Sequence, residues 1–284
     1  MNRNLIRIFA LALFALAGTS AHAAITCSIS SGGWSTAYVT TATTTNVTQS
    51  SFTLTCQRNV AADSTSLSYV VSVDNGIHFQ GQGNHGQNGT SQISYENYRD
   101  SGCTALWKSQ GGNRISGAMT LSGFVGTTVT TTYWGCVPAG QTGLPSGSYT
   151  DTVTMSVSDS SGGGAAIGSG TFGITIYYPA VCNVTQAPAD VAFTYTAFRA
   201  TPATASSIFG VTCTTTLPYT MALDATSGVV AGLQYLVSLS ASTGTGTGAQ
   251  QNYTISGTMP AGQAGTCATS SCTGTSVRTL TIGY

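Results

Sequence analysis

Along most of this chain, apolar and polar residues alternate with a period of two in short stretches. In Thr150-Asp-Thr-Val-Thr-Met-Ser-Val157, for example, Val153, Met155 and Val157 fall on one face of an extended backbone. Clusters of Gly, Ser, Asn and Pro separate such stretches roughly every ten residues. Short, regularly spaced strands with one apolar face indicate an antiparallel β-sandwich. We therefore predict an all-β fold.

The order of these stretches occurs twice. Three pairs correspond: Phe52–Cys56 with Phe209–Cys213, Leu67–Asp74 with Leu217–Asp224, and Val137–Gln141 with Met259–Gln263. We predict two tandem domains of the same fold, at residues 24–178 and 182–284, divided where a strand pattern stops at a proline. The first domain has the longer middle: 82 residues separate Cys56 from Pro138, against 47 between Cys213 and Pro260.

The eight cysteines are shared equally between the two predicted domains. An even count in an exported chain predicts disulfides, and four cysteines per domain leave nine pairings. Among these we favour Cys27–Cys56, Cys103–Cys136, Cys182–Cys213 and Cys267–Cys272. No cysteine pair has the spacing of a zinc site, and His78 and His85 lie far from any pair, so we expect no metal site.

The two predicted domains differ in their last strand. In the first, Phe172, Ile174, Ile176 and Tyr178 fall on one face of a final strand at 171–178. Aligning Thr152–Met155 with Thr279–Ile282 makes Tyr284 the equivalent of Val157, so the second domain has no such strand. An edge left open in this way exposes apolar side chains and unpaired backbone groups.

Composition narrows the class of protein further. The chain has one lysine, one glutamate and a formal net charge of zero. Helices with solvated faces need many such residues, so helical folds are excluded. No cluster of Lys and Arg follows the N-terminus, so we expect no nucleic-acid partner.

The first 23 residues have the pattern of a secretory signal peptide. Arg3 and Arg7 precede an apolar run at 8–17, and Ala21-His-Ala23 supplies small residues before a cleavage site. No later segment is long and uniformly apolar. We expect an exported, soluble mature protein.

Catalytic chemistry is not indicated. The acidic residues are mostly single and adjacent to turns, and no nucleophile-base-orienter order appears. Asp151 shares the parity of Val153 and Met155 and can point inward, where a carboxylate needs hydrogen-bond partners. We predict no enzyme activity and no cofactor.

Several motifs together resemble the spore coat protein U family. They are the cysteine spacing, Ala189–Phe193, Ile93–Tyr98 followed by Trp107, the Pro-Ala-Gly-Gln signature, and Gly147–Thr154. The resemblance covers the mature chain in two copies. It is weaker in the second, whose final stretch, Ser276–Tyr284, lacks the Tyr-Thr-Asp-Thr form.

That family includes subunits of archaic, Csu-type chaperone-usher pili, which are immunoglobulin-like sandwiches completed by a donated strand. The resemblance implies that a periplasmic chaperone, an outer-membrane usher and the next pilin subunit are partners. The donor-strand groove is then expected beside Leu280, Ile282 and Tyr284. Cys27 comes three residues after the predicted cleavage, leaving no segment to donate. We therefore expect a tip adhesin on the cell surface, binding a host or abiotic surface and promoting biofilm formation. The alternative is a structural coat or minor fimbrial component without a ligand.

Candidate surface-binding residues are apolar side chains in polar, glycine-rich loops of the first domain: Trp34, Tyr38, Ile77, Phe79, Phe124 and Trp134. Trp34 and Trp134 also lie near disulfide cysteines in sequence, so a position covering a disulfide stays open for both. Tyr95 and Trp107 are expected in the core.

Overall fold

The computed structural model describes residues 25–81, 83–160 and 164–284. The predicted signal peptide, residues 1–23, lies outside them. Apart from one 3-10 turn, η1 (Gly111–Asn113), every regular element in these ranges is a β-strand. The predicted all-β class is confirmed. No helix in the described ranges is long and apolar enough to span a membrane.

Residues 25–178, the N-terminal part, form one curled ten-stranded sheet in the order β1-β3-β8-β6-β5-β9-β10-β2, with β4 pairing β7 and β9. All pairings in it are antiparallel except that of β10 with β2. The strands are β1 (Thr26–Ser31), β2 (Trp34–Ala37), β3 (Asn46–Gln57), β4 (Ser66–Val73), β5 (Asn84–Asn88), β6 (Ser91–Tyr98), β7 (Ile115–Thr120), β8 (Thr127–Val137), β9 (Gly147–Asp159) and β10 (Ala166–Tyr178).

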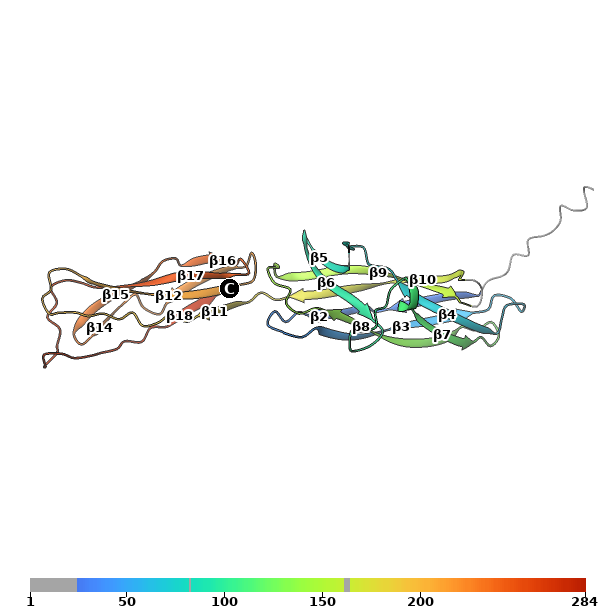
Figure 1. Cartoon of the computed structure of the whole chain (residues 1–284), viewed down its shortest axis with the longest axis horizontal. Helices are drawn as coiled ribbons and strands as arrows, with labels where there is room; N and C mark the ends of the chain where they lie inside the picture. The colour runs from blue at the N-terminus through green and yellow to red at the C-terminus, as the bar shows by residue number, and fades with distance from the viewer. Residues whose placement is uncertain (1–24, 82, 161–163) are drawn as a thin grey trace, which may run out of the picture.

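Residues 182–284, the C-terminal part, form a five-stranded sheet, β11-β12-β17-β15-β14, and a three-stranded sheet, β16-β13-β18. Figure 1 shows β11–β18 as one group along the long axis of the molecule and the strands of the N-terminal part as another. The strands are β11 (Cys182–Gln186), β12 (Ala203–Cys213), β13 (Pro218–Leu223), β14 (Ser227–Val230), β15 (Leu233–Leu239), β16 (Thr243–Thr245), β17 (Gln250–Met259) and β18 (Leu280–Gly283).

Each part has its own apolar cluster, and the two clusters are filled to different degrees. In the N-terminal part, 26 buried residues are flanked by 5 partly buried ones. In the C-terminal part, 10 are buried and 12 are only partly buried. More than half of the apolar side chains in the second cluster are therefore only partly buried. The exact boundaries of the two predicted domains stay a prediction.

The final strand expected in the N-terminal part is present as β10. Phe172, Ile174, Ile176 and Tyr178 are all buried there, as the period of two predicts. The core also contains Tyr95 and Trp107, as predicted.

Four disulfides join the eight cysteines in the favoured pairs: Cys27–Cys56, Cys103–Cys136, Cys182–Cys213 and Cys267–Cys272. Two of them occupy matching places in the sheets. Cys27 lies opposite Cys56 where β1 pairs β3, and Cys182 lies opposite Cys213 where β11 pairs β12.

Candidate functional site

The same arrangement of a tyrosine and a glutamine, which we call the tyrosine-glutamine corner, occurs in both parts. In the N-terminal part, the Tyr38 hydroxyl donates to Pro138 O at 3.2 Å and accepts from Gln141 N at 2.8 Å. The Gln141 side chain then pairs with the backbone of Ser94, accepting from its N at 2.6 Å and donating to its O at 3.0 Å.

The same bonds recur in the C-terminal part. Tyr195 donates to Pro260 O at 2.7 Å and accepts from Gln263 N at 3.1 Å. The Gln263 side chain pairs with the backbone of Gln234 at 2.6 and 3.0 Å. Residues can therefore be matched between the parts by position, with Tyr195 as the counterpart of Tyr38.

Matching the last strands corrects the alignment made from the sequence. Asp74 accepts from Thr154 N and its own amide donates to Thr154 O; Asp224 makes the same two bonds with Thr279. β18 is thus the counterpart of the second half of β9, displaced by two residues from the sequence alignment. Tyr284 corresponds to Asp159 and not to Val157.

In the described ranges of the C-terminal part, no strand takes the place that β10 has in the N-terminal part. β10 lies between β9 and β2, with Ile174 opposite both Asp151 and Trp34. The counterparts of its two neighbours are segments 187–202 and 272–279, and neither forms a strand. By position, these two segments match the strands on either side of β10, and neither is paired as a strand.

Apolar side chains border this open edge. Val191, Phe193 and Tyr195 on one segment, and Leu280 and Ile282 in β18, contact the second core but are only partly buried. Tyr284, the third predicted groove residue, is 63% exposed. We define the acceptor groove as the surface between residues 191–195 and 272–284.

Trp34 and Tyr38 are not surface-binding residues, so that prediction is wrong. Both are buried. Trp34 Nε1 donates to Asn97 Oδ1 at 3.0 Å, and its ring packs edge-on against Tyr95. Tyr38 stacks on Tyr178 with ring centroids 5.4 Å apart.

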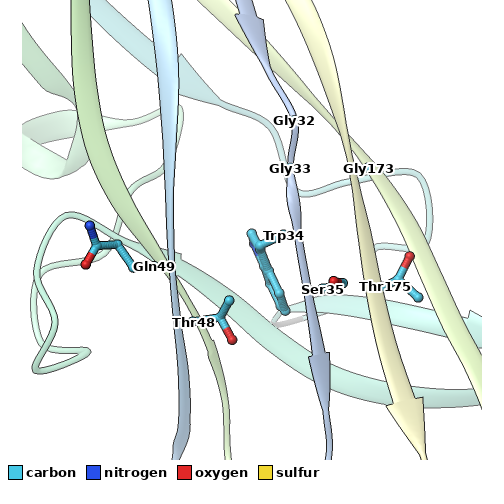
Figure 2. A pocket seen from close by; sticks show the side chains of 8 residues that line it. All are labelled: Gly32, Gly33, Trp34, Ser35, Thr48, Gln49, Gly173 and Thr175. Atoms are coloured by element: carbon cyan, nitrogen blue, oxygen red, sulfur yellow. The ribbon is translucent and has the colours of Figure 1, made fainter.

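Trp34 and Tyr38 are buried because the chain changes its pairing partner at Gly32-Gly33. Because β1 pairs β3 whereas β2 pairs β10, the chain crosses from one sheet edge to the other at these glycines. Gly33 has a φ of +70°, and a Cβ there would lie 1.8 Å from Gly173 O. Figure 2 shows Trp34 projecting between β2 and β3 beside a shallow hollow that Gly173 and Thr175 of β10 also line.

Trp134 lies within strand β8 rather than in a loop, which corrects its assignment. Its neighbours Tyr133 and Gly135 are buried, so Trp134 is on the opposite, outer face of the sheet. There it is half-buried, opposite Gln49 of β3 and Tyr98 of β6.

Ile77 and Phe79 are exposed in the loop between β4 and β5, at 68% and 44%. Asp151, 3% exposed, holds the base of this loop. Its carboxylate accepts from Ile77 N at 3.0 Å, His78 N at 3.3 Å, Thr152 N at 2.8 Å and the Tyr95 hydroxyl at 2.6 Å.

The burial of Asp151 and these four hydrogen bonds confirm that it points inward and is hydrogen-bonded. Burial, followed by the hydrogen bond from its hydroxyl to Asp151, raises the pKa of Tyr95 well above its ordinary value of 10.0. His78 Nδ1 also lies 3.3 Å from the carboxylate. In the C-terminal part, the counterpart pair is Tyr235 with Ser276, whose hydroxyls lie 2.6 Å apart.

Phe124 is 57% exposed in the loop between β7 and β8, next to Val125 at 77%. The loop after β3 lies beside it, because Arg58 stacks on the Phe124 ring at 5.9 Å. That loop also carries the exposed Val60. We call Val60, Phe124 and Val125 the end patch.

A model of the spore coat protein U domain matches residues 12–156 and 169–243. The chain belongs to this family. The family resemblance seen in the sequence is confirmed.

Solved structures similar to this spore coat U protein include two described as tip subunits. One is the tip adhesion subunit of the CsuC-CsuE pre-assembly complex from archaic chaperone-usher Csu pili of Acinetobacter baumannii. The identity is 14%, over 91% of this chain and 100% of that chain, with a TM-score of 0.47. The other is the CupB6 tip adhesin of Pseudomonas aeruginosa, with 12% identity over 86% of this chain and 90% of that chain and a TM-score of 0.42. No curated protein sequence matches the chain.

In this spore coat U protein, the exposed candidate residues do not form one surface. Ile77 and Phe79 share the loop above Asp151, whereas Phe124 belongs to the end patch. Val60 and Val125 were missed in the sequence because single valines in polar loops carry no periodic signal.

Proposed function

We propose that this chain is a chaperone-usher pilus subunit that accepts a strand in its acceptor groove and attaches cells to surfaces from the pilus tip. Membership in the spore coat U family supports this proposal, because that family includes subunits of archaic chaperone-usher pili. The observation that carries the proposal is the acceptor groove, where two segments match the neighbours of β10 by position but form no strands.

β10 is an internal template for the donated strand. Its four large buried side chains lie opposite Gly147–Val153 of β9. Since β18 matches the second half of β9, the counterparts of Gly147–Val153 are Cys272–Arg278. We therefore expect the donor to place large apolar residues beside residues 272–278, just before the predicted groove residues Leu280, Ile282 and Tyr284.

Two positions of the donor need small residues. A Cβ at Gly168 would lie 2.3 Å from Cys27 O, and one at Gly170 would lie 2.2 Å from Ile29 O, because β10 crosses β1 closely there. Gly170 and Gly168 lie opposite Met155 and Val157, the counterparts of Leu280 and Ile282. A large donor residue at either place is expected to clash with β11.

The partners follow from this groove. A periplasmic chaperone supplies the first strand during export, the outer-membrane usher receives the complex, and the next pilin subunit supplies the final strand. The protein then reaches the cell surface as part of the pilus.

The exposed apolar loops are the proposed attachment surface. Ile77 and Phe79 project from a loop held by Asp151, and the end patch adds a second apolar area. Apolar residues gathered in exposed loops mark interaction sites more often than they serve folding.

A grafted strand tests the groove. A second copy of residues 166–178 is fused after Tyr284 through a flexible linker, in the full mature chain. We expect higher periplasmic yield, protection of residues 187–202 from protease and a higher melting temperature. The matched control carries Ile174→Asp and Ile176→Asp in the graft alone. Equal yield and melting with both grafts contradict an open groove.

Attachment is tested with Ile77→Ser/Phe79→Ser and, separately, Phe124→Ser/Val125→Ser. We expect attachment of piliated cells to fall with at least one pair, while melting stays unchanged because these side chains are exposed. Thr53→Ser, on the exposed face of β3, is the control. If neither pair alters attachment, the chain has a structural role in the pilus and not an adhesive one.

A further inference from the structure

The single lysine and the single glutamate of this chain meet in the N-terminal part. Lys108 Nζ lies 2.8 Å from Glu96 Oε1 and 3.4 Å from Asn75 Oδ1. The Lys108 and Glu96 side chains are only 19% and 20% exposed. An amine, a carboxylate and a carboxamide therefore converge, and the amine belongs to the one lysine of the chain.

The backbone holds all three groups in place. Glu96 lies within β6 and is paired with β8. Lys108 N donates to Asn113 O at 2.7 Å, and the residue before it, Trp107, is fully buried. The backbone on both sides of Asn75 is hydrogen-bonded to β9. Reacting groups fixed in contact gain a large part of their rate advantage from this positioning.

The ion pair does not satisfy the carboxylate of Glu96. Its second oxygen, Oε2, is buried and has no hydrogen-bond partner among the described residues. An unpaired buried carboxylate oxygen is costly, and Oε2 of Glu96 is an acceptor still without a donor. It lies on the carboxylate that already contacts the Lys108 amine.

We propose that Lys108 and Asn75 form an intramolecular isopeptide bond, with Glu96 as the catalytic residue. Glu96 takes a proton from the Lys108 ammonium, and the neutral Nζ attacks Cγ of Asn75. Glu96 gives that proton to Nδ2 and carries the second proton of the attacking nitrogen to Nδ2 as well; the bond from Cγ to Nδ2 breaks, Nδ2 leaves as ammonium, and Glu96 returns to its carboxylate form. One amide is exchanged for another, so nothing is oxidised or reduced.

The bond would link the loop between β4 and β5 to the segment after β6, which are 33 residues apart in sequence. That loop carries Ile77 and Phe79. A covalent tie at its base keeps the loop in place under pulling forces, which hydrogen bonds to Asp151 alone resist less well. The link needs no second protein and is independent of the acceptor groove.

Peptide mapping of the full mature chain tests the proposal. The protein is exported to the periplasm, purified, denatured, reduced and digested with trypsin. We expect no cleavage after Lys108 and one species in which peptide 59–99 is joined to peptide 100–114. Its mass is the sum of the two peptides less one ammonia. Lys108→Arg and Asn75→Ala should each abolish this species, and Asn88→Ala should leave it intact.

Glu96→Gln separates the chemistry from packing, since glutamine keeps the shape but cannot take the proton. We expect the linked species to be lost in this variant. Complete cleavage after Lys108 in the unaltered protein overturns the proposal and leaves an ion pair only. Loss of ammonia from peptide 59–99 alone overturns it as well, because that result means cyclisation at Asn75-Gly76. Both results come from the unaltered protein and do not depend on whether the variants fold.

Discussion

Replacement of Asp151 by alanine tests how the exposed loop between β4 and β5 is held. Asp151 is buried in β9, and its carboxylate accepts from the loop at Ile77 N and His78 N and from the core at the Tyr95 hydroxyl. In the C-terminal part, Ser276 stands at the matching position. Asp151→Ala should therefore release a feature that only the N-terminal part has.

The size of the effect follows from the donors left behind. Ile77 N keeps a second acceptor, Thr152 O, at 3.1 Å. The His78 amide, the Thr152 amide and the Tyr95 hydroxyl lose the carboxylate as their acceptor. Each buried donor left unpaired costs about 1–3 kcal/mol, so we expect the free energy of unfolding to fall by about 3–9 kcal/mol. This is a large share of the stability of a typical domain.

Urea unfolding followed by tryptophan fluorescence measures this change, because all three tryptophans lie in the N-terminal part. Ser276→Ala is the matched control: it removes one hydrogen bond, to Tyr235, from the other part. We expect the control to leave the fluorescence transition unchanged. A loss below about 1 kcal/mol for Asp151→Ala would refute the reasoning, since a single unpaired donor costs that much.

Three further predictions follow from the core. Gly33→Ala should destabilise the protein and lower its periplasmic yield, because φ is +70° and the new Cβ meets Gly173 O; unchanged melting contradicts this. Trp34→Ala should lower the free energy of unfolding by about 3–5 kcal/mol, as for a buried aromatic, and urea titration measures it. The raised pKa of Tyr95 means that the unfolded chain loses its phenolic proton first. Stability is therefore full below about pH 10 and falls as pH rises further; phenolate absorbance that develops fully before unfolding contradicts this.

The pattern of alternating residues predicted the strands well, because each strand buries one face. β10 is the clearest case: four alternate large residues, read from the sequence, are all buried. The repeated cysteine spacing predicted matching disulfides because the two strands that carry the cysteines lie side by side, β1 with β3 and β11 with β12. Both features are local or repeated, and a single sequence shows them directly.

The strand with which a segment pairs, and the register of that pairing, were not predictable in the same way. Gly32-Gly33 is typical of a polar, glycine-rich loop, and this pattern predicts Trp34 and Tyr38 as binding candidates. The two glycines instead lie between β1, which pairs β3, and β2, which pairs β10. The second pairing brings Gly33 close to Gly173, which is 140 residues later in the sequence. The error of two residues in aligning β18 has a similar cause, because the register is set by Asp224 and Thr279.

Comparison of the two parts separates framework from function. The tyrosine-glutamine corner is made by the same atoms in both parts, so it serves the shared fold. Two of the differences between the parts leave surface uncovered: in its described ranges the C-terminal part has no strand where β10 lies, and Ser276 stands where Asp151 anchors a loop. The first difference leaves apolar side chains partly buried along one edge, and the second adds exposed apolar side chains above a buried carboxylate. Neither the open edge nor the exposed apolar side chains of the loop stabilise the part that carries them. Since each leaves surface that a partner can cover, these two places are where binding should be sought.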